Sequence, residues 1–155
     1  MRMQHSHRRS LLASSLLLLP IVAPAVHAHD QSGSFTSGAA AAVDYYQVTC
    51  SDDGNGTPDH LVFRIKDLTP NASRVSVTVG KGATCSPKAC ARSTTDRNDT
   101  DAAYSVPATV AQGAGVYLVF VSHTGPGVER YSLGYHCETV DNVHTGTTIT
   151  PRQQQ

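Results

Sequence analysis

The chain contains no tryptophan, and the common catalytic signatures are absent from it. It has no Gly-x-Ser-x-Gly nucleophile elbow, no His-Glu-x-x-His zinc-protease motif, no phosphate-binding Gly-x-x-x-x-Gly-Lys loop and no dinucleotide-binding glycine fingerprint. Because catalytic triads need not be local in sequence, an enzyme remains a third alternative. The sequence predicts a non-catalytic protein.

Long apolar runs are also scarce, and the one candidate lies near the N-terminus. Leu11–Val26 is apolar but contains two prolines, and it is shorter than the roughly 20 residues that a membrane span requires. A positively charged head precedes it, and Val26-His27-Ala28 offers a cleavage site after it. Residues 1–28 therefore indicate a signal peptide, with a membrane anchor as the alternative, and the mature chain is expected to begin near His29.

Basic side chains are few as well. Cleavage removes Arg2, Arg8 and Arg9 and leaves the mature chain mildly acidic. Nucleic acids and anionic membranes require concentrated Lys and Arg, so we expect neither as a partner. We expect the protein in the periplasm or outside the cell, where it meets an extracytoplasmic ligand or protein.

The mature chain divides into three expected segments. Residues 29–42 are rich in Gly, Ser and Ala and indicate a flexible lead-in. Residues 43–150 are expected to form one folded domain, and residues 151–155 a disordered tail.

Sustained helical periodicity is missing from residues 43–150, which instead alternate apolar and polar residues. This alternation predicts half-buried strands at Tyr46–Cys50, Leu61–Ile65, Val75–Val79 and Tyr131–Cys137. Val116–Val121 is apolar in both phases and predicts a central strand covered on both faces. Short strands between Gly/Pro turns favour an all-β, antiparallel sandwich of the jelly-roll or immunoglobulin-like kind, with a small closed barrel as the alternative.

Four cysteines lie in the mature chain, and an even number in an exported protein favours disulfides. Cys50 and Cys137 end two strands on their apolar phase, so we expect them to bridge in the core. Closing that long loop contributes roughly 4–5 kcal/mol in the chain-entropy model. Cys85 and Cys90 share a polar insertion and are expected to staple it locally.

One candidate metal site is the acidic loop 52–59. Asp53, Asn55, Thr57 and Asp59 alternate along it with glycine between them, which is how a short loop wraps calcium. The stretch resembles the acidic loops of thrombospondin type III repeats, although only one such loop is present. The alternative is a polar turn in which Asp, Asn and Gly serve the backbone geometry.

A second candidate metal site is the new N-terminus. A chain beginning at His29 exposes an amine and an imidazole that can chelate copper, as in copper histidine-brace proteins, with another histidine completing the site. The other mature histidines are His60, His123, His136 and His144. His60 and His136 fall on outward strand phases and are expected to be exposed, so plain surface histidines are the alternative.

Aromatic residues raise a third hypothesis, because an exposed tyrosine row can stack on sugar rings. Five tyrosines lie on predicted strands: Tyr45, Tyr46, Tyr117, Tyr131 and Tyr135. Three of them, Tyr46, Tyr131 and Tyr135, are on apolar phases and are expected in the core. A carbohydrate-binding module is therefore a second alternative function.

The segment Gly115-Val116-Tyr117-Leu118-Val119-Phe120-Val121, followed by Thr124–Gly127 and Tyr131-Ser132-Leu133, resembles the closing hairpin of bacterial pre-peptidase C-terminal domains. Those domains are jelly-roll-like sandwiches attached to secreted enzymes. The resemblance covers mainly residues 115–133 and implies a non-catalytic accessory or binding role. The leading hypothesis is thus an exported, non-catalytic β-sandwich binding protein that calcium stabilises.

Overall fold

The computed structural model describes residues 29–82, 90–97 and 103–155, and these residues form nine β-strands. The strands are β1 (His29–Phe35), β2 (Val43–Ser51), β3 (His60–Asp67), β4 (Val75–Gly80), β5 (Ala91–Thr95), β6 (Ala108–Val110), β7 (Gly115–His123), β8 (Glu129–Glu138) and β9 (His144–Gln153). No helix in the described ranges is long and apolar enough to cross a membrane.

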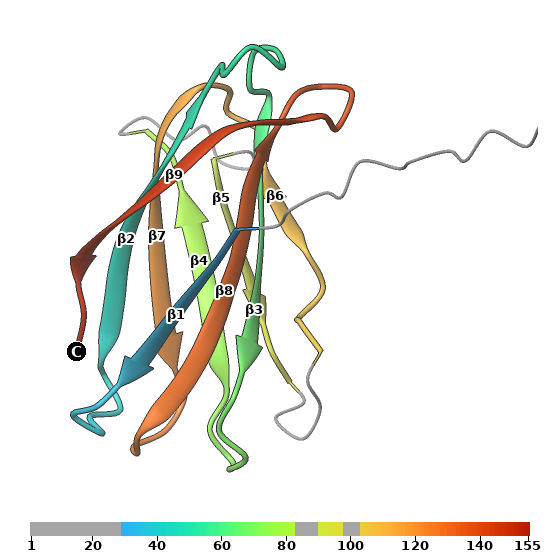
Figure 1. Ribbon diagram of the computed structural model, residues 1–155. Coiled ribbons are helices and arrows are strands. Elements are labelled where there is room, and N and C mark those ends of the chain that lie inside the picture. The colour runs from blue at the N-terminus through green and yellow to red at the C-terminus, as the bar shows by residue number, and fades with distance from the viewer. Residues whose placement is uncertain (1–28, 83–89, 98–102) are drawn as a thin grey trace, which may run out of the picture.

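The strands build two facing layers, and every pair of neighbouring strands is antiparallel (Figure 1). One layer has the order β5-β4-β7-β2, and the other has the order β8-β3-β6 with β1 paired against β8. Strand β9 pairs first with β8 and then with β2, so it passes from one layer to the other. The predicted antiparallel β-sandwich is confirmed. In the described ranges β5 pairs with β4 alone and β6 with β3 alone, so these edges do not close a barrel.

The core lies between the layers and follows from the alternation of the strands. Val48, Phe63, Val77, Val119 and Leu133 are all buried and come from five different strands. The predicted core tyrosines Tyr46, Tyr131 and Tyr135 are buried as well. Burial of such side chains is the main favourable contribution to the stability of a domain of this size.

A disulfide between Cys50 on β2 and Cys137 on β8 joins the layers through the core, as predicted. Their Cα atoms are 5.6 Å apart, and both side chains are almost completely buried. Cys90 is also disulfide-bonded. Its predicted partner, Cys85, lies outside the described residues, as does the predicted signal peptide 1–28.

Two predictions about the chain ends are wrong. Residues 29–35 are not a flexible lead-in, because β1 pairs along β8 and ends in Phe35, which is fully buried. Residues 151–155 are not a free tail either: β9 extends to Gln153, and the Gln155 backbone bonds to Thr36 and to the Asp44 carboxylate. Both segments are polar, so apolar alternation gives no signal for a strand in them. Hydrogen bonds between backbones nevertheless hold them against the rest of the fold.

The structure differs from two further expectations, a hairpin formed by β7 and β8 and a β7 covered on both faces. The two strands do not form a hairpin, because β7 pairs with β2 and β4 whereas β8 pairs with β1, β3 and β9. The connection between them crosses from one layer to the other. Strand β7 is also not covered on both faces, since Val116 and Phe120 remain about two-fifths exposed on its outer side.

A buried polar network lies beside β1, around Tyr131 of β8. The Tyr131 hydroxyl donates to the Asp44 carboxylate and lies 2.6 Å from the Tyr46 hydroxyl, which also accepts from Gln154. Gly33 of β1 passes directly over the Tyr131 ring, and a Cβ at Gly33 would lie 2.3 Å from that ring. The glycine is therefore needed for this close approach of backbone and ring.

We predict that Gly33→Ala lowers the free energy of unfolding by about 1–3 kcal/mol, because Tyr131 is held by hydrogen bonds and cannot move aside. Gly80→Ala is the matched control in strand β4, where the nearest atom to a new Cβ would be 3.7 Å away. The control should change stability by less than about 0.5 kcal/mol. Urea denaturation of both variants measures the difference, and equal midpoints would contradict this account of Gly33.

Candidate metal site

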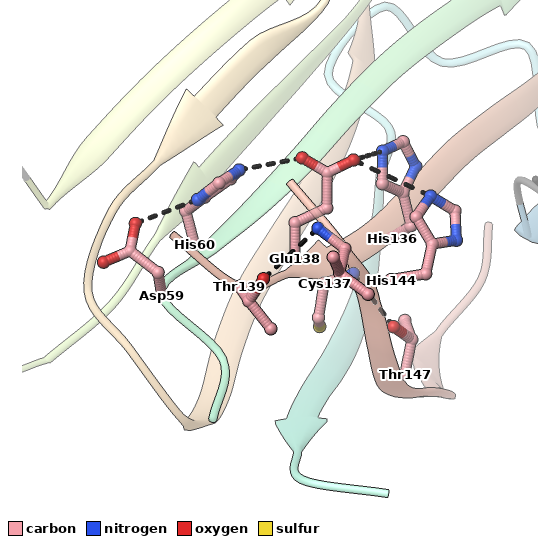
Figure 2. A network of polar contacts seen from close by, with 9 residues as sticks. Asp59, His60, His136, Cys137, Glu138, Thr139, His144 and Thr147 are labelled. Atoms are coloured by element: carbon pink, nitrogen blue, oxygen red, sulfur yellow. Dashed lines mark hydrogen bonds and ion pairs between the residues drawn. The ribbon is translucent and has the colours of Figure 1, made fainter. Parts of the chain in front are cut away.

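One carboxylate, that of Glu138, meets three histidines from three strands at one end of the sandwich (Figure 2). His60 opens β3, His136 and Glu138 lie near the end of β8, and His144 opens β9. The strand register explains the meeting, because His60 and His144 are the direct cross-strand partners of Glu138 on its two sides. His136 precedes Glu138 by two residues and so shares its face of β8.

The two oxygens of Glu138 have different partners. Oε1 lies 2.9 Å from His136 Nε2 and 3.7 Å from His144 Nε2. Oε2 lies 2.9 Å from His60 Nε2. Figure 2 shows the carboxylate between His60 on one side and His136 with His144 on the other.

His60 lies between two carboxylates. Its Nδ1 is 2.9 Å from Asp59 Oδ2, and its Nε2 contacts Glu138 at the same distance. Ionised carboxylates only accept hydrogen bonds, so the ring makes both bonds when each of its nitrogens carries a proton. In that state the imidazolium links Asp59 to Glu138 by two charge-assisted hydrogen bonds.

The prediction that His60 and His136 are exposed is wrong, although both do face outward. The side chain of His60 is 10% exposed, that of Glu138 13%, that of His136 17% and that of His144 25%. The His136 and His144 rings stack with their centroids 4.3 Å apart and thereby shield one another. The outward positions of His60 and His136 in their strands gave the wrong expectation, because neighbouring strands place large side chains beside them. These side chains cover one another.

Burial lowers the pKa of His136 below its usual value, and neighbouring His144 lowers it further. Glu138 opposes both effects by its charge and its hydrogen bond, and Arg64 adds a smaller lowering. The folded protein therefore favours the neutral His136 ring, which is the form that binds metals.

His136, Glu138 and His144 form the one group of three or more His, Cys, Asp or Glu residues, among those described, whose ligand atoms converge. Their ligand atoms all lie within 4.8 Å of one another. Tetrahedral zinc with bonds of about 2.0–2.1 Å separates its ligand atoms by roughly 3.3 Å. The distances from Glu138 Oε1 to the two Nε2 atoms, 2.9 and 3.7 Å, bracket that value.

His144 also has spare ligand capacity. Its Nε2 is buried and has no hydrogen-bond partner in the described part of the protein. A buried nitrogen without a partner costs free energy, which a metal–ligand bond would recover. By contrast, His136 Nε2 donates to Glu138 in the metal-free protein, so metal binding there would require the neutral ring to carry its proton on Nδ1 instead.

The turn between Glu138 and His144 is well defined. The backbone of Thr139 donates to Val143, and Asn142 closes the turn with a φ of 59°, a left-handed conformation that asparagine tolerates. Beyond the turn, Thr147 Oγ1 accepts from the Cys137 backbone. These contacts hold His144 opposite Glu138.

The predicted calcium loop lies beside this site. Asp53 Oδ1 accepts from the Asn55 backbone and from Thr145 Oγ1, while the Asp59 carboxylate turns to His60. Gly54 and Gly56 have positive φ angles, as the polar-turn alternative expects. Calcium binding by Asp53, Asn55, Thr57 and Asp59 stays a prediction.

The other histidines lie apart from the group. His29 begins β1, and its ring stacks on Tyr135, which faces the core, whereas His136 faces outward. His123 stacks on Phe35 and contacts the Ala39 carbonyl, beyond the opposite end of β8. Copper binding by His29 stays a prediction, and the described geometry does not make that ring part of the His136 group.

The outward aromatic pair bears on the carbohydrate hypothesis. Tyr45 and Phe120 lie side by side on β2 and β7, with centroids 5.0 Å apart and planes 15° from parallel. Each ring therefore covers one face of the other. Sugar stacking uses ring faces, and carbohydrate binding stays a prediction.

Sequence reasoning missed the group because His144 lies on β9 while His136 and Glu138 lie on β8, and His60, which holds Glu138 from the other side, lies on β3. One local signal was available: His136-x-Glu138 on a strand places both side chains on one face. Comparison of the chain with protein-family models finds no matching family, and comparison with curated proteins finds no match.

The lowered pKa of His136 predicts a pH dependence of stability. The folded state disfavours the charged ring, so the stabilisation is present above the ordinary pKa of 6.5 and is lost as the pH falls below it. His136→Asn should therefore lose less stability than the wild type between about pH 7.5 and about pH 5.5. Urea midpoints at the two pH values measure this, and equal losses in both proteins would exclude His136 as the source.

Proposed function

We propose that the protein is an exported, non-catalytic β-sandwich binding protein whose ligand is a divalent transition-metal ion. The observation that carries the proposal is the convergence of His136, Glu138 and His144, whose ligand atoms all lie within 4.8 Å of one another. The pre-peptidase C-terminal resemblance agrees with a non-catalytic role, and it remains part of the proposal.

The donor set fits this class of ion. Imidazole nitrogens suit zinc, copper and nickel, whereas calcium and magnesium prefer a shell of oxygens. Two histidines and one carboxylate leave a fourth position of a tetrahedral ion for water or another small ligand. The partly shielded rings exclude much of the solvent, and the His144 side chain is the most exposed of the three, at 25%.

Export is supported by the chemistry of the cysteines. The Cys50–Cys137 disulfide is typical of proteins in oxidising compartments, and Cys90 is disulfide-bonded too. The predicted signal peptide agrees with this, and the histidines would then meet metal ions outside the cytoplasm.

Isothermal titration of the mature protein with Zn²⁺ tests the proposal. We expect one ion per chain, and we expect His136→Ala or His144→Ala to weaken binding on the order of 100-fold or more. His123→Ala is the matched control, because it removes a buried imidazole far from the group and should leave affinity unchanged. Absence of binding by the wild type, or equal loss in all three variants, would contradict the proposal.

A further inference from the structure

We propose that His60, held by Asp59, makes the metal site selective for a small four-coordinate ion such as Zn²⁺ or Co²⁺ over larger cations. This inference rests on the proposed function, since it concerns the same site. His60 contacts none of the three proposed ligand atoms. It is a positioning residue, because it acts on the site through Glu138.

First, the two oxygens of the Glu138 carboxylate have different partners. Oε2 is engaged by His60 Nε2 at 2.9 Å, and Oε1 alone faces His136 and His144. For both oxygens to reach one ion, the carboxylate would have to rotate away from His60. The His60 side chain is only 10% exposed, so its N–H would then be left largely buried without an acceptor. Glu138 is therefore restricted to one donor atom.

The second step is the anchoring of His60. Asp59 binds His60 Nδ1, and the Asp59 backbone N–H donates to the Glu138 carbonyl at 2.8 Å. The Asp59 carbonyl in turn accepts from the Gly113 backbone at 2.8 Å. The same short segment is thus fixed to β8 by its main chain and to Glu138 through the His60 ring.

The third step connects this geometry to the choice of ion. Calcium takes 6–8 oxygen ligands at about 2.3–2.6 Å and commonly uses a carboxylate through both oxygens. A site with one carboxylate oxygen and two imidazole nitrogens offers neither the number nor the kind of ligand that it needs. Zinc and cobalt accept four ligands at about 2.0–2.1 Å, which these three atoms and one further ligand supply.

Co²⁺ is the probe for the test, because its visible absorption distinguishes four-coordinate from higher-coordinate sites. The wild type should give the intense bands of a four-coordinate ion. His60→Ala frees Oε2, so the bands should weaken toward a higher-coordinate spectrum, and Co²⁺ affinity should fall roughly 10–100-fold.

Two further variants separate positioning from folding. His60→Gln keeps an N–H donor near Glu138 and should restore the four-coordinate spectrum. Asp59→Asn keeps the side-chain volume but removes the charge that holds His60, and it should shift the spectrum in the same direction as His60→Ala, to a smaller extent. These two conservative variants carry the test if His60→Ala fails to fold, and His123→Ala should leave the spectrum unchanged.

The outcomes separate the two proposals. A wild type that binds Co²⁺ in four-coordination, with His60→Ala and Asp59→Asn giving the same spectrum and affinity, would overturn the role of His60 and leave the proposed function standing. A wild type that binds neither Co²⁺ nor Zn²⁺ would overturn both. A spectrum that changes in His60→Ala and is not restored in His60→Gln would show that the hydrogen bond to Oε2 is not the cause.

Discussion

The disulfide between Cys50 and Cys137 is the constraint on which the candidate site depends. It joins β2 to β8, and β9 passes between these two strands at the same place, with Thr147 opposite Cys50 and Thr145 opposite Cys137. Cys137 lies between His136 and Glu138 in sequence, so the bond that ties the two layers together also anchors two candidate ligands from beneath. The third candidate ligand, His144, lies on β9, which pairs with β8 at only two positions. Its placement therefore depends on the disulfide-bonded end of these strands.

Two carboxylates and three imidazoles contact one another at the site. Glu138 is shared by three imidazoles, and Asp59 contacts His60 from its other side. His136 is biased toward its neutral form by burial and by His144. The metal-free protein thus holds a ligand set near its binding geometry, and an ion requires a change of tautomer at His136 and no rebuilding of the fold. Such preorganisation favours selectivity, because the cost of rearranging for an ion of another size is high.

Much of the fold could be predicted from local patterns, and the site could not. Alternation located the core faces of β2, β3, β4 and β8, and the phase of Cys50 and Cys137 identified their pairing. Polar strands gave no such signal: β9 contains one large apolar residue, Ile149, and β1 is mostly Gly, Ser and polar residues. Because His144 lies on β9, and because the register of β3, β8 and β9 sets which histidines meet Glu138, the site emerges only from the tertiary structure.

The central claim is that His136, Glu138 and His144 bind one transition-metal ion in the folded, disulfide-bonded protein. The most direct measurement is a crystal structure of the zinc-loaded mature protein, with the ion located by anomalous scattering. The account predicts one zinc bound by His136 Nε2, His144 Nε2 and Glu138 Oε1, with His60 still bonded to Glu138 Oε2. Zinc bound instead at His29 or in the 52–59 loop, or held by both Glu138 oxygens with His60 displaced, would contradict it.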